Sequence, residues 1–353
     1  MSKMRTKHWH VDNSVDVLDT YPQIEEAAEL LKQDEVVAFP TETVYGLGGN
    51  ALSDQAAAKI FAAKGRPADN PLIVHIASKQ QVADIAANIS QTAERLMEAF
   101  WPGPLTVILE KQPNRLSRLV TAGLETVAVR MPDHPVALAV IHKCGLPIAA
   151  PSANRSGKPS PTSARHVQDD LDGVIAGIID GGDTGVGVES TVVDCTGSIP
   201  VILRPGGITK EDIEAVVGEA AIDAALTDMN QQPKSPGMKY KHYAPEAPVY
   251  LLDGSRSWVQ SRINEQRQEG KKVGLLTTEE NLSFYEADVI LPCGRRDDLR
   301  TVAHSLYEVL RAFNETDVDI IYSETFPTDG VGLAIMNRLE KAAAHRWLHE
   351  KQK

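Results

Sequence analysis

The first 205 residues alternate short apolar runs with amphipathic segments. Apolar residues at helical spacing predict helices at 22–34, 53–63, 90–100 and 135–143. β-Branched, apolar runs predict strands at 35–40, 72–76, 105–110, 126–130, 147–150, 178–182, 189–194 and 201–204. Because polar motifs follow several of these strands, the pattern predicts an α/β domain with a ligand site at the strand ends.

In the second part of the chain, predicted strands alternate with predicted helices in a simpler pattern. Strands are expected at 249–252, 272–276, 289–291 and 318–322, and helices near 258–268, 299–313 and 333–348. Such alternation predicts a small parallel sheet surrounded by helices. No GxGxxG turn follows its first strand, and we identify no catalytic constellation in it.

Two loops carry the strongest chemical signal. Residues 63–71 and 149–161 are punctuated by Gly and Pro, which predicts rigid loops at the ends of strands or helices. The first contains Lys64 and Arg66, and the second combines Arg155 and Lys158 with hydroxyl and amide side chains. Because such groups bind polyphosphate, we expect the two loops to meet around nucleotide phosphates.

Other polar features have a structural and a functional interpretation. The Thr-rich run at 40–49 is an ordinary turn or part of the site, and His75 is a packed residue or a ligand-binding one. Residues 218–247 predict an interdomain linker. Its segment 235–245 contains Lys241, His242 and Tyr243 between prolines, so it could also form a lid over an anionic ligand.

Length and composition narrow the class of protein. At 353 residues, two or three domains are expected. No apolar run approaches the roughly 18 residues of a membrane span, and the polar start does not resemble a secretory signal. The three widely spaced cysteines predict buried small hydrophobes in a reducing, cytoplasmic location, with a catalytic thiol as the alternative.

The net charge of −12 divides evenly along the chain. Residues 1–207 hold 18 Lys and Arg against 24 Asp and Glu, and the remainder holds the same numbers, so each part carries −6. This balance argues against a general nucleic-acid-binding surface. The basic residues that lie in or beside the loop motifs favour a small anionic ligand: Lys64, Arg66, Arg115, Arg118, Arg130, Arg155, Lys158 and Arg204.

Several motifs in this order resemble the YrdC family. They are the runs at 40–47, 64–67, 101–106, 129–132, 151–154, 189–191 and 203–206, which include the KxR pair Lys64/Arg66 and the SxN pair Ser152/Asn154. The run 236–245 and the C-terminal part resemble the long, two-domain form of the threonylcarbamoyl-AMP synthases. The resemblance covers nearly all of the chain after about residue 20.

The resemblance implies a fold and its boundaries. The expected fold class is α/β, with a YrdC-like domain at 20–208 built on a twisted, open mixed sheet with helices and a concave basic pocket. A linker with a lid motif is expected at 209–247. A smaller Rossmann-like α/β domain is expected at 248–353.

The resemblance also implies a reaction. L-Threonine, bicarbonate and ATP, with Mg²⁺, would give threonylcarbamoyl-AMP and pyrophosphate. The product would serve the modification of tRNA at position 37 to threonylcarbamoyladenosine, through a separate transfer complex. The metal would be held by phosphate oxygens and water, because Mg²⁺ seldom uses a full protein cage.

The resemblance assigns roles to individual residues. Lys64 and Arg66 would be catalytic, acting on phosphate oxygens and developing charge. ATP would be bound by Arg66, Asn70, Thr126, Ser152, Ser160, Arg204 and Tyr243. Threonine would be bound by Thr43, His75, Arg130, the Ala150 backbone and Ser190. The guanidinium group of Arg130 would bind its carboxylate through two N–H donors.

Two other classes of protein remain as alternatives. A non-catalytic RNA-binding module would use the same basic concavity, and its tRNA binding would depend steeply on salt without any use of ATP. A carbamoyltransferase of hydrogenase maturation contains a YrdC-like module, but it should also bring zinc-type cysteine pairs and further domains. This chain shows neither.

Overall fold

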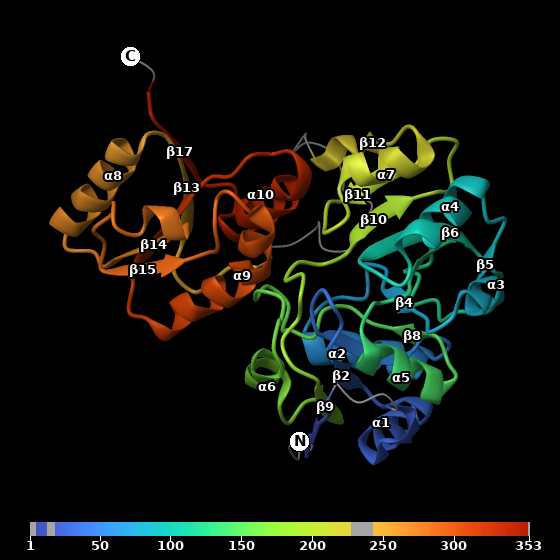
Figure 1. Ribbon diagram of the computed structural model, residues 1–353. Helices are drawn as coiled ribbons and strands as arrows, with labels where there is room; N and C mark the ends of the chain where they lie inside the picture. The colour runs from blue at the N-terminus through green and yellow to red at the C-terminus, as the bar shows by residue number, and fades with distance from the viewer. Residues whose placement is uncertain (1–4, 13–17, 227–242, 352–353) are drawn as a thin grey trace. The chain divides into compact units, whose positions relative to one another are not determined.

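The computed structural model describes residues 5–12, 18–226 and 243–351. The chain divides into two compact units (Figure 1). The first comprises Met1–Ser156 and Ser160–Lys239, and the second comprises Gly157–Pro159 and Tyr240–Lys353. Within the described residues, no helix is both long enough and apolar enough to span a bilayer.

A twelve-stranded mixed sheet forms the frame of the first unit. Its strand order is β1-β9-β2-β3-β8-β4-β7-β6-β10-β11-β12, and β5 pairs with β6. The sheet combines parallel pairs such as β4 with β7 and antiparallel pairs such as β6 with β7. The strands are β1 (Lys7–His10), β2 (Val37–Phe39), β3 (Gly46–Asn50), β4 (Ile73–His75), β5 (Ala86–Ala87), β6 (Leu105–Lys111), β7 (Thr126–Arg130), β8 (Ile148–Ala149), β9 (Gly177–Asp180), β10 (Thr191–Asp194), β11 (Val201–Arg204) and β12 (Ala221–Ile222).

Seven α-helices accompany this sheet in the described part of the first unit. Ser53, Ser90, Ser163 and Thr209 each cap a helix by accepting a hydrogen bond from a backbone N–H of its first turn. Such caps satisfy donors that the helix itself leaves unpaired. The helices are α1 (Pro22–Lys32), α2 (Asp54–Lys64), α3 (Val82–Ile85), α4 (Gln91–Phe100), α5 (Pro135–Cys144), α6 (Ala164–Leu171) and α7 (Lys210–Val217).

The first unit has separate apolar clusters because successive strand residues point to opposite faces of the sheet. In β2, Val37 and Phe39 pack into one cluster with apolar residues of α1 and α5. Ala38, between them, packs into the other large cluster, which contains residues of α2 and α4. The sheet is therefore covered by apolar contacts on both faces, and polar groups are left for the strand ends.

The second unit is a five-stranded parallel sheet with the order β15-β14-β16-β13-β17. Its strands are β13 (Val249–Asp253), β14 (Val273–Thr277), β15 (Val289–Pro292), β16 (Ile320–Glu324) and β17 (Trp347–His349). Its helices are α8 (Arg256–Gln268), α9 (Leu299–Ala312) and α10 (Gly330–Ala342). A mixed sheet in the first unit and a small parallel sheet in the second confirm the expected fold class.

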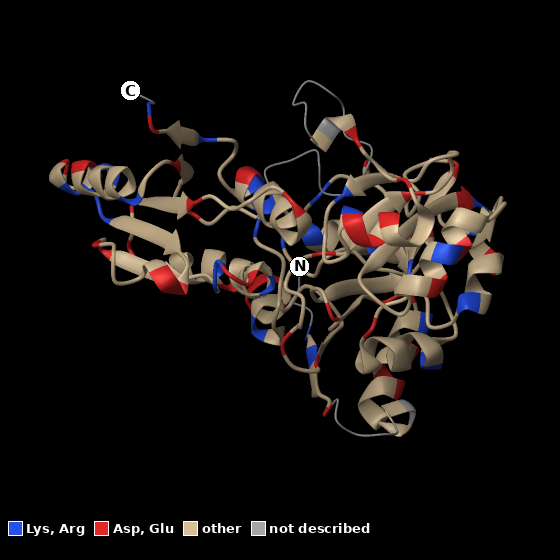
Figure 2. Cartoon of the chain, turned by 45° about the horizontal axis from the view of Figure 1, so that its top comes forward, with Lys and Arg blue, Asp and Glu red and all other residues tan. Residues whose placement is uncertain are grey.

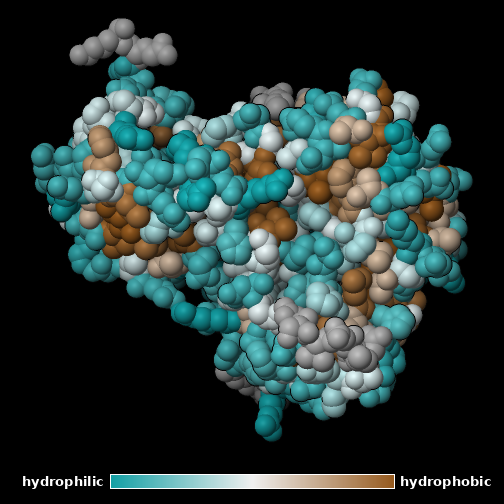
Figure 3. Space-filling view, viewed as in Figure 1, coloured by the Kyte–Doolittle hydropathy of each residue, from teal (hydrophilic) through white to brown (hydrophobic). Residues whose placement is uncertain are grey.

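Charged residues of both signs are interspersed over the elements of each unit (Figure 2). The surface in Figure 3 is accordingly mostly polar, with separate apolar patches. The exposed large apolar side chains are Leu52, Leu124, Val174, Ile199, Leu282 and Phe284.

The structure corrects several local expectations. The glycine-rich run after the Thr-rich turn is strand β3, not part of a turn. Lys64 is the last residue of α2 rather than a loop residue. The helix expected at 333–348 ends at Ala342, and β17 follows it. Strand β1 and helix α6 were not expected from the sequence pattern.

Candidate active site

The two cation-bearing segments meet, as the sequence predicts, through Lys64 at the end of α2. The Lys64 ammonium group donates hydrogen bonds to the backbone oxygens of Ser152 and Asn154, at 2.5 and 2.8 Å, and to Asn154 Oδ1 at 3.2 Å. The Lys64 backbone oxygen accepts from the Ser156 N–H at 2.9 Å. Helix α2 therefore fixes the SxN loop through its last residue.

Lys64 is fully enclosed, and this changes its acid–base behaviour. Burial, followed by the nearby Arg66 guanidinium, lowers the pKa of Lys64 to about 7, while Asp170 and Glu189 act in the opposite direction. Both carboxylates and Arg66 thus lie within electrostatic reach of one ammonium group. A lysine with a pKa near neutrality in a polar cluster is typical of a functional site.

Other polar residues of the two segments lie near Lys64 and form further hydrogen bonds. Ser152 Oγ donates to Asn154 Oδ1 at 2.6 Å, and buried Ser160 donates to Glu189 Oε1 at 2.5 Å. Arg66 Nη2 donates to the Asn70 backbone oxygen at 3.2 Å, and its guanidinium lies over the Phe61 ring. The Asn70 side-chain nitrogen is buried without an acceptor among the described residues.

A second group of polar side chains lies on the central strands. His75 of β4 is paired in register with Arg130 of β7. Arg130 Nη1 donates to Thr43 Oγ1 at 2.8 Å, so the Thr-rich turn reaches the end of β7. Burial, and then the charge of Arg130, lowers the pKa of His75 to about 3, which keeps its imidazole neutral. The structure therefore brings Thr43, His75 and Arg130 together.

Arg204 and Ser190 form the third part of the site. Arg204 at the end of β11 donates from Nε to the Ser190 backbone oxygen at 2.9 Å and from Nη2 to Ser190 Oγ at 3.0 Å. Ser190 Oγ also lies 2.7 Å from Thr106 Oγ1. The charge of Arg204 contributes to lowering the pKa of His75, which links this pair electrostatically to the Arg130 group.

Sequence reasoning missed Glu42, which lies between two threonines of the same turn. Its carboxylate forms an ion pair with Arg130, with Oε1 2.6 Å from Nη2 and both side chains largely enclosed. Arg130 Nε donates to the Gly103 backbone oxygen at 3.3 Å. Arg130 thus already has a carboxylate partner inside the protein. The only signal in the sequence was the position of Glu42 in the Thr-rich turn.

Thr126, the Ala150 backbone and Tyr243 complete the set of predicted site residues. Thr126 lies at the start of β7, on the same strand as Arg130. The Ala150 N–H donates to the Ile73 backbone oxygen at 2.9 Å. Tyr243 is assigned to the second unit, where its buried ring stacks on Tyr307. Lys241 and His242 of the proposed lid lie outside the described residues.

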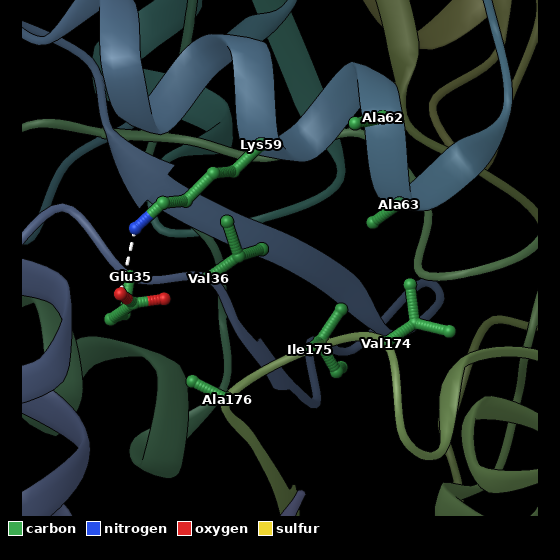
Figure 4. A pocket seen from close by; sticks show the side chains of 8 residues that line it. All are labelled: Glu35, Val36, Lys59, Ala62, Ala63, Val174, Ile175 and Ala176. Carbon is green, nitrogen blue, oxygen red and sulfur yellow. Dashed lines mark hydrogen bonds and ion pairs between the residues drawn. The ribbon is translucent and has the colours of Figure 1, made fainter. Parts of the chain in front are cut away.

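A separate pocket of about 230 Å³ lies beside α2 (Figure 4). Its walls are mostly apolar, and an ion pair of 2.7 Å between Lys59 and Glu35 lies at one end. Its lining contains none of the predicted site residues: Glu35, Val36, Lys59, Ala62, Ala63, Val174, Ile175 and Ala176.

The cysteines do not form part of the candidate site. All three are free and buried. Burial raises the pKa of Cys144 to about 11 and that of Cys195 to about 12, and it raises the pKa of Cys293 as well. Thiols with raised pKa values are poor nucleophiles, which confirms their interpretation as packed small hydrophobes. The described residues contain no cluster of three or more His, Cys, Asp or Glu side chains arranged for a metal ion.

Comparisons with known proteins agree with this architecture. A family model described as "Telomere recombination" matches residues 29–206, and one described as "Threonylcarbamoyl-AMP synthase, C-terminal domain" matches residues 208–344. A protein of Bacillus subtilis named threonylcarbamoyl-AMP synthase is 60% identical over 97% of this chain and 99% of its own. The chain belongs to the threonylcarbamoyl-AMP synthase family.

Two further comparisons extend across both units of this family member. A protein of the same name from Pyrococcus abyssi is 50% identical over 91% of this chain and 94% of its own. A crystal structure of P. abyssi Sua5 complexed with L-threonine has 47% sequence identity and a TM-score of 0.91, covering 98% of this chain and all of that one. The family assignment therefore includes the second unit.

Proposed function

We propose that this protein is an L-threonylcarbamoyladenylate synthase. Bicarbonate loses hydroxide to give carbon dioxide, and the amine nitrogen of L-threonine forms a C–N bond with its carbon. The proton lost from the nitrogen combines with the hydroxide to form water, and a carbamate results. A carbamate oxygen then attacks the α-phosphorus of ATP, the bond between the α-phosphorus and the bridging oxygen breaks, and pyrophosphate leaves. This is a nucleotidyl transfer, in which positioning and charge neutralisation supply most of the rate.

One structural observation carries the proposal. Lys64 joins the KxR and SxN segments through three hydrogen bonds, so that cations, hydroxyls and amides from distant parts of the chain converge. The buried, unsatisfied amide nitrogen of Asn70 beside Arg66 supports an external acceptor there, such as a phosphate or ribose oxygen of ATP. The names of the full-length relatives support the same reaction.

The residue roles are part of the proposal. Arg66 acts on the phosphate oxygens, and Lys64 holds the loop on which the nucleotide rests. Thr43, His75, Arg130, Ser190 and the Ala150 backbone form the threonine subsite, and the P. abyssi relative complexed with L-threonine supports an amino-acid subsite. ATP is held by Asn70, Thr126, Ser152, Ser160 and Arg204, and Tyr243 stays an expected ATP ligand.

We further propose that ATP enters with Mg²⁺, which neutralises charge on the phosphate oxygens when bound. Phosphate oxygens and water supply most ligands of such an ion, so a dedicated protein cluster is not required. The product is passed to a separate tRNA-modifying transfer complex that acts on position 37, and the protein works in the cytoplasm.

Pyrophosphate release tests the proposal. ATP, Mg²⁺ and bicarbonate are supplied with L-threonine, without it, or with L-serine in its place. Release that needs both threonine and bicarbonate supports the synthase. Tight tRNA binding with a steep salt dependence and no pyrophosphate release would instead favour the RNA-binding module.

A further inference from the structure

The Glu42 carboxylate is unusual among the buried carboxylates of this protein. Its Oε1 lies 2.6 Å from Arg130 Nη2, yet neither carboxylate oxygen receives a hydrogen bond of good geometry from any described residue. Both oxygens are inaccessible to solvent. An enclosed carboxylate oxygen without a donor is energetically costly, because the hydrogen bonds to water that it loses are not replaced.

Two other buried carboxylates, by contrast, accept hydrogen bonds from donors within the protein. Glu324 in the second unit accepts from five donors, among them Asn281 Nδ2 at 2.7 Å and Tyr285 OH at 3.0 Å. Glu189 accepts from Ser160 Oγ. Glu42 differs because its Oε2 lacks such a donor within the described part of the chain. A donor from a bound ligand would remove this deficit.

Arg130 beside it has hydrogen atoms left for a ligand. A guanidinium group carries five N–H donors. Among the described residues, Arg130 uses Nε for Gly103, one N–H of Nη1 for Thr43, and Nη2 for the ion pair with Glu42. The pair therefore places a cation and an anion side by side in an enclosed position, with N–H groups of Arg130 and an oxygen of Glu42 that have no hydrogen-bond partner among the described residues.

The charges around this pair favour a cation next to Glu42. Asp133 lies close enough for Glu42 to help burial raise its pKa. Burial lowers the pKa of His134, so the neighbouring imidazole is mainly neutral near neutral pH, although Glu42 opposes that shift. Among the described residues, Arg130 is the cationic group paired with the Glu42 carboxylate. The neutral imidazole of His134 would add little repulsion toward a second cation.

We propose that Glu42 binds the α-ammonium group of threonine while Arg130 binds its α-carboxylate. This inference rests on the proposed function and names a threonine-binding residue that motif reasoning did not assign. An α-amino acid carries its two opposite charges on groups bonded to the same carbon, and the Arg130–Glu42 pair offers the complementary arrangement. The interaction would select α-amino acids over other small carboxylates and would hold the nitrogen that forms the carbamate once it has lost a proton.

Competition binding with two ligands tests this assignment. Labelled L-threonine is displaced by unlabelled L-threonine or by 3-hydroxybutyrate, which keeps the carboxylate and hydroxyl but lacks the amine. The wild type should bind threonine at least about 10-fold more tightly than 3-hydroxybutyrate, as expected for a hydrogen bond to a charged group. Equal binding of the two ligands would overturn the proposal without any variant.

The Glu42→Gln variant separates ammonium binding from a merely structural role. It should weaken threonine binding about 10-fold or more and change 3-hydroxybutyrate binding less than about twofold. An equal loss for both ligands would mean that Glu42 only holds Arg130 in place, and unchanged threonine binding would also overturn the inference. Glu42→Asp retains the charge and should recover part of the preference for threonine.

A matched control comes from the pocket beside α2. Glu35→Gln also removes a carboxylate from an ion pair, in this case with Lys59, but outside the candidate site. It should leave the affinities for threonine and for 3-hydroxybutyrate unchanged. Failure of the wild type to bind threonine would contradict the proposed function itself. Binding by the wild type with no loss in Glu42→Gln would contradict only the further inference.

Discussion

The ammonium group of Lys64 lies 2.8 Å from the backbone oxygen of Asn154, although 90 residues separate them in the chain. This contact ties the end of α2 to the loop after β8. Because the loop carries Ser152 and leads to Ser160, the position of one buried lysine controls where several candidate nucleotide ligands lie. Lys64 therefore acts first as a positioning residue.

The acid–base behaviour of Lys64 should appear in the stability of the fold. Its pKa falls from 10.5 to about 7 in the folded state. Between these values the unfolded chain binds a proton that the folded chain does not, so the free energy of unfolding should rise with pH, by at most about 1.4 kcal/mol per pH unit. Lys64→Met should remove this rise, as measured by urea unfolding between pH 6.5 and 9.

Lys79→Met is the control, because it removes an exposed lysine in the 3₁₀ turn Lys79–Gln81. The difference in unfolding free energy between wild type and Lys64→Met should grow with pH, whereas the difference for Lys79→Met should stay constant. A pH-independent difference for Lys64→Met would contradict a lowered pKa.

Arg66→Ala should reduce turnover much more than stability. Its guanidinium is proposed to neutralise charge that develops on the phosphates, and loss of one such group typically costs about 10² to 10³ in rate. We expect that loss in pyrophosphate release, with a change in Tm of only a few degrees. Arg165→Ala, at an exposed position on α6, should leave the rate unchanged. Normal turnover of Arg66→Ala would refute the phosphate-site assignment.

Gly206→Ala should damage the site through the backbone. A Cβ at this position would lie 2.4 Å from the Thr191 nitrogen and 2.5 Å from the Glu189 oxygen. Relief of that overlap must displace the segment containing Ser190, to which Arg204 donates twice. We expect a loss of about 1–3 kcal/mol in unfolding free energy and at least about 10-fold in activity.

Gly197→Ala provides the comparison for this backbone effect, because its nearest neighbour to an added Cβ is an oxygen at 3.7 Å. This variant should change neither the free energy of unfolding nor the activity appreciably. Kinetics and chemical denaturation of the two variants side by side measure the effect, and equal behaviour would show that the segment around Ser190 tolerates displacement.

The buried carboxylate of Glu324 should dominate the stability of the second unit. It accepts hydrogen bonds from Thr277, Asn281, Tyr285 and other donors at the carboxyl end of the parallel sheet. Glu324→Gln would place an amide N–H₂ against some of these donors, at a cost of about 2–5 kcal/mol. Glu286→Gln, at an exposed position, should cost less than about 0.5 kcal/mol by the same unfolding measurement.

Local sequence signals predicted most elements and the meeting of the two loops. Apolar spacing and capping residues such as Ser53 and Thr209 act over a few residues, so they can be recognised without a structure. The convergence at Lys64 could be expected because both loops carry groups suited to the same anion.

Features that depend on distant partners were not predictable in this way. Strand β1 exists through its parallel pairing with β9, which lies far away in the sequence. Strand β3 is rich in glycine, and a Cβ at Gly48 would lie 2.5 Å from the Phe39 ring, so packing rather than strand propensity selects glycine there. The Arg130–Glu42 pair likewise joins two segments that no local pattern connects.

The fate of ¹³C-labelled bicarbonate tests the central claim most directly. The protein is incubated with ATP, Mg²⁺, L-threonine and the labelled bicarbonate, and the adenylate product is examined at once by mass spectrometry. The proposed reaction predicts one ¹³C atom in an adenylate that also contains threonine, formed together with pyrophosphate. An unlabelled threonyl-adenylate, or pyrophosphate release without any labelled adenylate, would contradict it.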